Sequence, residues 1–393
     1  MVAAPTTSLA SRRRGHSRPT GLARQSCDVV IVGAGPAGLA TAIVTARQGL
    51  SVVVLERREF PPDKACGEGI LPPGVRALER LGVLNCLDPS ELYPFAGICF
   101  FQEDGSSLEF RLPRGGGLGI RRTVLIEALT RRAEQLGAVI RHRCYVSHVR
   151  FSPEESIVRT SAGNIAARLI VAADGLHSPL RRAAGLEAAS RLPRRFALRQ
   201  HYNVAPWTNV VEVYVDDKGE AVATPVCSDT VTVNFTWKDG LIAGPSITSL
   251  ARRFPALQAR LEGAATMTPV RGAGPMARVA TRRTSEGLVL MGDAAGFVDS
   301  ISGDGLSVAF NSALTLGRHL PDVLAQRATQ RSLAAYESAA RRLFRGYWIV
   351  TNGLLWLARH PRTRKATIRY LSRNQRILGA VVNAAMTMMI VAD

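Results

Sequence analysis

The sequence lacks a long apolar run, is poor in acidic residues and has no closely paired cysteines, and each shortage excludes a class of protein. No uncharged apolar stretch reaches about 18 residues, so a polytopic membrane protein is excluded. Global disorder is also excluded, because it requires few apolar residues and these make up 46% of the 393. At roughly 100–200 residues per domain, the length predicts two or three structural units.

The cysteines argue against a metal site or a disulfide framework. None of the six is spaced as C-x-x-C, and all lie scattered through apolar segments, as buried thiols do in a reducing compartment. The N-terminus also lacks the continuous apolar stretch of a secretory signal. We therefore predict a cytoplasmic protein without a metal ion.

The shortage of acids is confined to the two ends of the chain. Acidic residues number 31 against 50 Lys and Arg, a formal charge of +19, yet residues 27–340 carry only +5. Residues 1–26 hold five arginines and no acid, which predicts a disordered basic leader, with an organelle transit peptide as the alternative. No nucleic-acid partner is predicted, because that would require a basic patch with interleaved aromatics on a recognisable binding fold.

The first chemical motif is a glycine-rich turn. Residues 27–32 have the length of a strand, residues 39–47 the composition of a helix, and residues 51–55 form a second apolar strand that ends at Glu56. This pattern is a β-α-β unit, and its turn is Gly33-Ala34-Gly35-Pro36-Ala37-Gly38. It predicts a dinucleotide-binding site.

Each residue of this motif has a physical role in binding a dinucleotide. Gly33 permits the tight turn, Gly35 lets the backbone approach a pyrophosphate, and Gly38 allows the helix to pack closely on the strand. The helix N-terminus offers free N–H groups and a positive dipole end to the phosphates. Glu56 lies 23 residues after Gly33, where its carboxylate can accept hydrogen bonds from ribose hydroxyls.

Two further junctions between a strand and a loop carry an aspartate. One apolar run ends in Asp174-Gly175. Another ends in Gly292-Asp293, followed by a glycine-rich loop and a helix that begins near Gly305. The second arrangement directs a carboxylate and a helix N-terminus at a polyol or a phosphate. Taken singly, each junction is more often an ordinary turn.

In this order and at this spacing, the three motifs resemble the FAD-dependent oxidoreductases of the glutathione-reductase-like class. That class contains aromatic hydroxylases, flavin halogenases and geranylgeranyl reductases. The resemblance covers roughly residues 27–345 and implies FAD as the cofactor, with NAD(P)H as a transient electron donor. It also implies that Asp293 binds the ribityl chain and that residues 303–306 lie near the pyrimidine edge of the flavin.

The same resemblance extends the cofactor site to two other elements. It implies a cofactor-contacting arginine at a helix start, where the R-x-x-L register favours Arg122, and an adenine contact at Val146. The predicted cofactor-binding residues are Gly33, Gly35, Pro36, Ala37, Gly38, Glu56, Arg57, Arg122, Val146, Asp174, Gly292, Asp293, Gly303 and Gly305.

Candidate catalytic residues lie in a second glycine-rich loop. Residues 64–69 resemble the Cys-Gly-rich loop that the geranylgeranyl-reductase branch carries near its flavin. Cys66 is a candidate redox or positioning thiol, and Glu68 a candidate for steering a proton. A structural thiol and a turn carboxylate are the alternatives. Asp304 either lies close to the flavin or caps the following helix.

The sequence departs from every specialised branch of the class. Gly296-Phe297 and the Cys66 loop favour the geranylgeranyl reductases. The substrate sheet of that branch normally carries an aromatic Y-x-W-x-F-P string, of which residues 219–225 keep only Pro225. The favoured hypothesis is an NAD(P)H-dependent monooxygenase that uses O₂, through a flavin C4a-hydroperoxide, on a hydrophobic small molecule, aromatic or polyketide-like. The alternatives are a reductase of prenyl or quinone double bonds and a non-catalytic, membrane-associated flavoprotein.

The predicted fold is α/β, with a Rossmann-like FAD-binding domain, an inserted antiparallel substrate sheet and a helical C-terminus. The sheet is predicted from short, alternating β segments separated by Pro, Asp and Gly over residues 190–270. The substrate pocket is expected between this sheet and the flavin. The predicted boundaries are 27–96, 115–190 and 270–340 for the FAD-binding domain, 97–114 and 191–269 for the substrate-binding sheet, and 341–393 for the C-terminal segment.

The C-terminal segment combines positive charge with apolar helices. Helices are predicted over residues 325–343 and 347–357, with a break at Gly353, and the uncharged stretch 377–392 is too short to span a bilayer. Its tryptophans and flanking arginines suit peripheral contact with an anionic membrane. A helical cap on the FAD-binding domain and a dimer contact are the alternatives.

Overall fold

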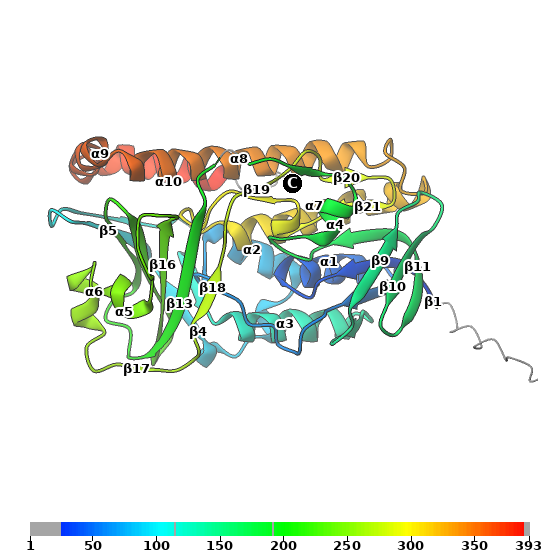
Figure 1. Ribbon diagram of the computed structural model, residues 1–393, viewed down its shortest axis with the longest axis horizontal. Helices are drawn as coiled ribbons and strands as arrows, with labels where there is room; N and C mark the ends of the chain where they lie inside the picture. Colours follow the sequence, from blue (N-terminus) through cyan, green and yellow to red (C-terminus); the bar gives the residue numbers. More distant parts are fainter. Residues whose placement is uncertain (1–24, 114, 191, 389–393) are drawn as a thin grey trace, which may run out of the picture.

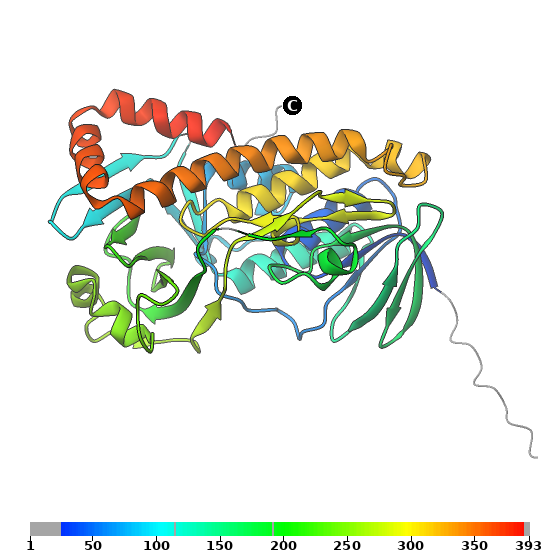
Figure 2. The same ribbon diagram turned by 45° about the horizontal axis from the view of Figure 1, so that its top comes forward.

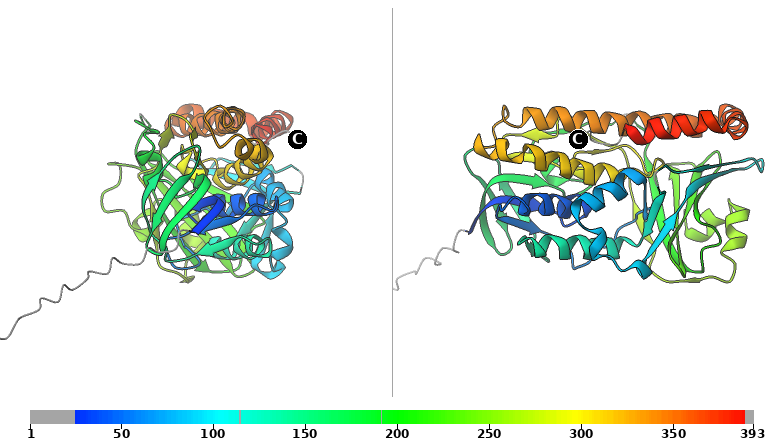
Figure 3. Two further views of the ribbon diagram at one scale, coloured as in Figure 1. Left: turned by 90° about the vertical axis from the view of Figure 1, so that its right-hand side faces the viewer. Right: turned by 180° about the vertical axis from the view of Figure 1, so that it is seen from behind.

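The computed structural model describes residues 25–113, 115–190 and 192–388, so the leader predicted over residues 1–26 lies almost wholly outside the described residues. Two large sheets stand towards opposite ends of the molecule, and long helices run along one side of both (Figures 1 and 3). Residues from both sheets line one cavity between them. The arrangement therefore places the loops of the first sheet opposite the inner face of the second.

The first sheet contains the β-α-β unit. Strand β1 (Gln25–Val32) pairs in parallel with β2 (Val52–Leu55) and with β11 (Gly163–Ala172). The strand order is β20-β21-β11-β1-β2-β8, and the β9–β10 pair is attached to β11. Because parallel strands end at one edge, the loops after β1, β2, β11 and β21 meet there. The remaining strands are β8 (Val139–Arg141), β9 (Val146–Arg150), β10 (Ser156–Thr160), β20 (Thr284–Ser285) and β21 (Leu288–Leu290).

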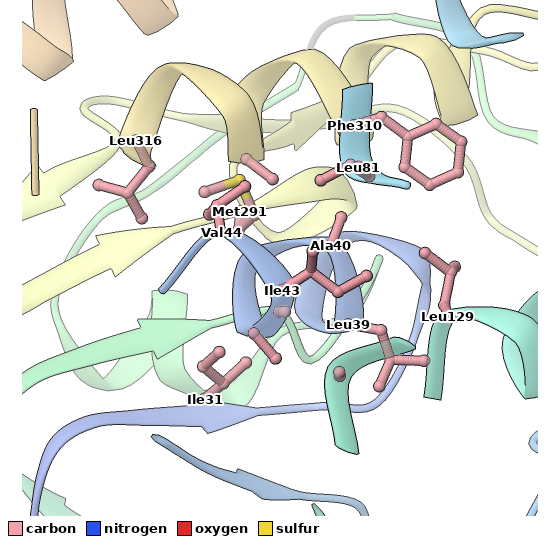
Figure 4. Close-up of a cluster of buried hydrophobic side chains, with 14 of the residues drawn as sticks. Ile31, Leu39, Ala40, Ile43, Val44, Leu81, Leu129, Met291, Phe310 and Leu316 are labelled. Carbon is pink, nitrogen blue, oxygen red and sulfur yellow. The ribbon is translucent and has the colours of Figure 1, made fainter. Parts of the chain in front are cut away.

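The central strands of this sheet are apolar, and helices cover one of its faces. The alanine-rich α1 (Pro36–Ala46) packs against α3 (Arg122–Gln135) and α7 (Gly305–Ala325). Figure 4 shows Leu39 and Ile43 of α1 in the cluster with Phe310 of α7 and Ile31 of β1. All four side chains are fully buried, so the glycine turn is fixed between a rigid strand and a rigid helix.

The second large sheet turns one face towards the first sheet. Its order is β17-β13-β16-β15-β14-β5-β6, with β18 paired to β13. Its outer face packs on α5 (Ile247–Ala251) and α6 (Pro255–Arg260). The strands are β5 (Gly97–Gln102), β6 (Ser107–Arg111), β13 (Arg195–Asn203), β14 (Val210–Val215), β15 (Gly219–Cys227), β16 (Thr230–Lys238), β17 (Ala265–Thr266) and β18 (Arg271–Ala273).

Besides the elements above and the C-terminal helices, the described residues form two small sheets and five helices. The small sheets consist of β3 (Gly69–Ile70), β7 (Gly117–Ile120) and β4 (Leu92–Phe95), and of β12 (Glu187–Ala188), β19 (Arg278–Ala280) and β22 (Gly296–Phe297). The helices named so far are joined by α2 (Pro72–Leu81), α4 (Pro179–Ala183), η1 (Leu84–Cys86), η2 (Pro89–Glu91) and η3 (Gly292–Ala294).

The C-terminal helices differ from the predicted ones. The helix predicted over residues 325–343 is confirmed from residue 334 on, but its predicted start is wrong, because α7 continues to Ala325 and the next helix, α8 (Ala334–Arg359), begins only after a turn. The break predicted at Gly353 is also wrong. A glycine costs a helix about 1 kcal/mol, which the burial of Tyr347 and Leu355 on the same helix outweighs. Helices α9 (Pro361–Arg373) and α10 (Gln375–Thr387) then fold back over β6 (Figure 2).

The α/β fold class predicted from the sequence is confirmed, with its β-α-β unit, second sheet and helical C-terminus. One pairing departs from the expected antiparallel second sheet, since β14 and β5 run parallel. The division of the chain into domains at the stated residue numbers stays a prediction.

Candidate functional site

One large cavity lies between the two sheets and extends beneath the C-terminal helices. Its volume is about 1400 Å³, and it reaches from Gly35 at the end of β1 to Met386 on α10. The edge at which parallel strands end is where α/β sheets bind their ligands. This cavity is therefore the candidate functional site.

The turn after β1 is packed so closely that two of its positions exclude a side chain. Gly33 has a φ of +108°, and a Cβ there would lie 2.3 Å from the carbonyl oxygen of Ala173. A Cβ on Gly38 would lie 1.9 Å from the carbonyl oxygen of Gly33. No side chain of the described residues caps the start of α1 at Gly35, so its first N–H groups are left for a ligand.

Glu56 and Arg122 flank this turn. The carboxylate of Glu56 accepts hydrogen bonds from the N–H groups of Ala34 (2.9 Å) and Arg58 (3.0 Å), and it keeps lone pairs for further donors. One Nη atom of Arg122 lies 3.8 Å from the position that a Cβ on Gly35 would take. The Nε of Arg122 is buried and has no hydrogen-bond partner among the described residues. A guanidinium held in this way above a glycine turn is suited to a phosphate.

Arg181 joins the two aspartate loops. Its fully buried guanidinium donates to the carbonyl oxygens of Leu176 (2.9 Å), Ala294 (3.0 Å) and Asp293 (3.3 Å). Asp174 accepts from the N–H of Leu180 at 3.1 Å, while its Oδ1 is buried without a partner among the described residues. The loop after β11 is thereby fixed against the loop after β21.

Asp293 and Lys64 place opposite charges inside the cavity. Both side chains are exposed, but their accessible surface lines the cavity. Desolvation raises the pKa of Asp293 above its usual value, against the opposing attraction of Lys64, Arg122 and Arg181. Desolvation, followed by repulsion from Arg122, lowers the pKa of Lys64. A polar ligand seated between these groups would relieve the desolvation of both.

Glu68 is a fixed carboxylate that ties its loop to the second sheet. It is buried, with a φ of +59°, and it is hydrogen-bonded to Nε2 of His201 (2.7 Å), the N–H of Arg122 (2.9 Å) and the hydroxyl of Thr232. Burial opposes its ionisation, but these three partners outweigh it and hold the pKa of Glu68 below its usual value. The carboxylate lines the cavity, and its role in steering a proton stays a prediction.

The thiol of Cys66 also lines the cavity. Burial raises the pKa of this thiol, in spite of the neighbouring Arg122, so the thiol is protonated at neutral pH. It therefore has the low reactivity of a neutral thiol. A positioning role and a structural one both fit this state, and its catalytic role stays a prediction.

Asp304, at the start of α7, is the most isolated carboxyl of the cavity wall. It is 2% exposed, and its Oδ1 has no hydrogen-bond partner among the described residues. It occupies the N-cap position of α7, but within the described part of the chain its side chain makes no capping hydrogen bond. Desolvation raises its pKa to about 8, opposed only by a hydrogen bond with Ser302. Asp304 is therefore largely protonated at neutral pH.

The structure brings most of the predicted residues to this cavity. Gly33, Gly38 and Glu56 do not line the cavity, but they shape the turn whose residues Gly35, Pro36 and Ala37 do. Val146, the first residue of β9, is not part of the lining. The predicted residues on the cavity wall are Gly35, Pro36, Ala37, Arg57, Cys66, Glu68, Arg122, Asp174, Gly292, Asp293, Gly303 and Gly305. Their individual roles stay predictions.

Four features of the site were missed by reasoning from the sequence. Lys64 and Arg181 are single basic residues in loops without a characteristic spacing. Asn234 of β16 lines the cavity from a strand that carries no motif. The apolar wall formed by α8, α9 and α10 depends on where the chain folds back. Lys64 begins the glycine-rich loop of residues 64–69 and Arg181 lies six residues after Gly175, so both lay near enough to a motif to be suspected.

The chain is similar to known FAD-binding proteins. A family model described as an FAD binding domain matches residues 26–347. The menaquinone reductase of Mycolicibacterium smegmatis is 56% identical over 61 residues, which are 16% of this chain and 15% of that protein. Digeranylgeranylglycerophospholipid reductase 2 of Methanopyrus kandleri is 28% identical over 336 residues, covering 78% of this chain and 79% of that protein. Across the first three curated relatives, the alignments span at most 46% of the relative's length.

A solved structure shows the same fold. The p-nitrophenol 4-monooxygenase from Pseudomonas putida DLL-E4 superposes with a TM-score of 0.79 over 94% of this chain and 100% of that one. The two sequences are 19% identical, so the similarity is one of fold.

The residues of the cavity fit FAD. The start of α1 and the guanidinium of Arg122 offer donors for a pyrophosphate, and Glu56 offers an acceptor for ribose hydroxyls. Asp293, whose charge is desolvated inside the cavity, offers an acceptor for a polyol. The closely packed Gly33 and Gly38 bring the backbone near enough for these contacts. The part of the cavity next to the loops of the first sheet thus has the donors and acceptors that this cofactor requires.

Proposed function

We propose that this chain, which belongs to the FAD-binding domain family, is an oxidoreductase that reduces double bonds in the apolar chain of a prenylated lipid. The observation that carries the proposal is the apolar half of the cavity. Three strands of the second sheet, β14, β5 and β6, turn only aliphatic and aromatic side chains into it. These side chains are Val211, Val213, Val215, Ile98, Phe100, Leu108 and Phe110.

The C-terminal helices close this apolar half from the other side. Ile368 and Leu371 of α9 and Leu378, Val382 and Met386 of α10 line the cavity opposite the strands. All but Leu371 of these side chains are buried, and Arg364 and Thr367 of α9 are the polar residues of the same helix on this wall, so the wall is mainly apolar. A long hydrocarbon fits such a wall, because each buried CH₂ contributes about 0.8 kcal/mol. The curated relatives support this substrate class, since the reductase of Methanopyrus kandleri is named for a lipid with two geranylgeranyl chains.

The residues around the cavity supply what such a reduction needs. FAD, when bound, supplies an electron pair taken from NAD(P)H. The apolar wall orients the chain and excludes water. Asp304 holds a proton on a buried carboxyl and belongs to the loop, residues 303–306, that the sequence resemblance assigns to the pyrimidine edge of the flavin. We propose that Asp304 donates this proton to one alkene carbon; bound, reduced FAD would supply the hydride equivalent that the other carbon needs.

Product mass and oxygen labelling test the reaction type. With FAD, NADPH and a geranylgeranyl lipid, we expect products that are heavier by two hydrogens for each reduced double bond and that contain no label from ¹⁸O₂. The rate should be the same without oxygen. The monooxygenase predicted from the sequence is the second candidate, because a mainly apolar wall suits the oxygenation of a hydrocarbon equally. Incorporation of ¹⁸O, with no anaerobic turnover, would establish it in place of the reductase.

We further propose that the protein takes this lipid from an anionic membrane surface. Ile349 of α8 and Val381 of α10 are both exposed and line the cavity, and we propose that the lipid enters between these helices. Trp348 and Trp356 of α8 and Tyr370 of α9 are exposed as well. Exposed arginines of these helices and of α10 include Arg359, Arg362, Arg369, Arg373 and Arg376. None of the helices within the described ranges has the length and apolarity of a membrane span. Peripheral binding by aromatic and basic side chains fits these helices.

Sedimentation with lipid vesicles tests this surface. The protein should bind vesicles that contain phosphatidylglycerol and should bind neutral phosphatidylcholine vesicles far more weakly. Replacing Arg373 and Arg376 by glutamine should weaken binding by roughly thirtyfold, since each basic residue near an anionic surface contributes about 1 kcal/mol. The control is Arg159→Gln, an exposed arginine on β10. Equal loss in the control, or equal binding to neutral vesicles, would contradict the proposal.

A further inference from the structure

The inner face of the second large sheet changes character from one side to the other. Along β14, β5 and β6 the side chains that line the cavity are apolar. Along β15 and β16 they are Glu220, Thr224, Asn234 and Thr236, with Val222 as the only apolar member. The change occurs between neighbouring strands, because β15 pairs with β14 on one side and with β16 on the other. The cavity therefore has a polar half and an apolar half on one continuous surface.

Charged groups on the polar half are engaged with one another. Glu220 accepts hydrogen bonds from Arg195 of β13, and Arg195 also donates to Asp299 at 3.1 Å. Thr232, two residues before Asn234 on the same face of β16, donates a hydrogen bond to Glu68. These partners hold Glu220 and Thr232 in place and leave the two side chains little capacity for a ligand.

Asn234 differs from these neighbours. Its side chain is 8% exposed, it lines the cavity, and its Nδ2 has no hydrogen-bond partner within residues 25–113, 115–190 and 192–388. The residue opposite it on β15 is Val222, which cannot accept a hydrogen bond. A buried amide donor without an acceptor costs about 1–3 kcal/mol. An acceptor carried by a ligand would recover that free energy.

We infer that Asn234 binds the oxygenated head of an amphipathic lipid substrate, donating a hydrogen bond from Nδ2 to a carbonyl or hydroxyl oxygen of the head. The hydrocarbon chain then lies across β14, β5 and β6 towards α10. This inference rests on the proposed function and adds to it that the head enters the cavity with the chain. It therefore favours a prenylated quinone or alcohol over a bare hydrocarbon.

The dimensions of the sheet agree with such a ligand. Four strand spacings separate β16 from β6, which at about 4.8 Å each corresponds to about 19 Å. The first spacing, from β16 to β15, is polar, and the remaining three cross the apolar strands. A head of one or two rings fits the first part, and several isoprene units fit the rest. The polar and apolar parts of the surface thus match a head and a chain in order.

Calorimetric titration of the oxidised, FAD-loaded protein tests this inference without any turnover. The probes are a short-chain menaquinone and the hydrocarbon that has the same chain and no oxygen, in the same detergent. The variant Asn234→Leu removes the donor and keeps the volume. It should weaken menaquinone binding roughly tenfold and leave hydrocarbon binding unchanged. The matched control, Val213→Ala on β14, should weaken the binding of both probes by the same factor.

Three results would overturn the inference. These are equal effects of Asn234→Leu on both probes, no effect on either, and loss of FAD from the variant, which would assign Asn234 to the cofactor. Failure of the proposed reductase activity is a separate outcome. If menaquinone binding depends on Asn234 but no reduced chain is formed, head recognition stands and the reductase does not. If chains are reduced while Asn234→Leu leaves the binding of both probes unchanged, the reductase stands and head recognition does not.

Discussion

Replacing Gly38 by alanine is expected to yield a protein that retains no FAD. The added Cβ would lie 1.9 Å from the carbonyl oxygen of Gly33 and 3.2 Å from the Cβ of Ala173. The first neighbour cannot yield easily, because it is backbone and Gly33 itself packs against Ala173: a Cβ on Gly33 would lie 2.3 Å from the carbonyl oxygen of Ala173. The start of α1 must therefore move away from β1. A clash of this kind costs about 3 kcal/mol, so FAD affinity should fall by more than a hundredfold.

The ratio of flavin to protein absorbance after gel filtration measures this loss. The control is Gly379→Ala on α10, where an added Cβ meets no described atom within 4 Å, and its flavin content should equal that of the unaltered protein. Gly35→Ala separates folding from binding, since its Cβ would meet only Arg122, at 3.8 Å. Without FAD, the Gly35→Ala variant should unfold at the same temperature as the unaltered apoprotein, and it should still bind FAD weakly. Full flavin content in the Gly38 variant would refute the assignment of this turn to the cofactor.

The cofactor half of the site could be predicted from the sequence because its constraints are local. The turn from Gly33 to Gly38 must follow a strand and open a helix, and the closeness of Gly33, Gly38 and Ala173 explains why alanine is excluded at two positions. Asp174 and Asp293 likewise follow buried parallel strands, so their loops had to meet at one edge of the sheet. In each case a residue's place in space followed from its place after a strand.

The substrate half could not be predicted in the same way, because its residues come together only through tertiary packing. Asn234 lines the cavity because of the register between β15 and β16, and a shift of one residue would turn it to the outer face. Ile368 and Val382 line it because α9 and α10 fold back over β6. The sequence showed that the C-terminal segment is apolar and basic, and it left a membrane contact and a helical cap as alternatives. In the structure one helical face lines the cavity while another is exposed, so the two interpretations are compatible.

Replacing Asp304 by asparagine is expected to lower the rate of double-bond reduction by about a hundredfold, the usual effect of removing a general acid. Asparagine keeps the size and the hydrogen bond with Ser302 but cannot give a proton to carbon. The carboxyl must be protonated to act, and its pKa is raised to about 8 by desolvation. Turnover of the unaltered protein should therefore be constant below that pH and fall as the pH rises through about 8. In the variant the remaining rate should lack this decline.

Two other measurements separate this role from a structural one. Reduction of the bound flavin by NADPH, measured without lipid, should proceed at the same rate in the protein and in Asp304→Asn. Thermal stability should also distinguish a catalytic role from a structural one. Because the pKa of Asp304 is raised in the folded state, the protein loses stability as the pH rises from the usual carboxyl pKa to about 8. Above that pH, the variant should therefore unfold at a temperature no lower than that of the unaltered protein. Three other carboxyls of the described cavity lining also have a raised pKa: Asp174, Glu220, which is paired with Arg195, and Asp293, which is close to Lys64. If the decline near pH 8 persists in Asp304→Asn, the proton comes from one of these groups and Asp304 is not the donor.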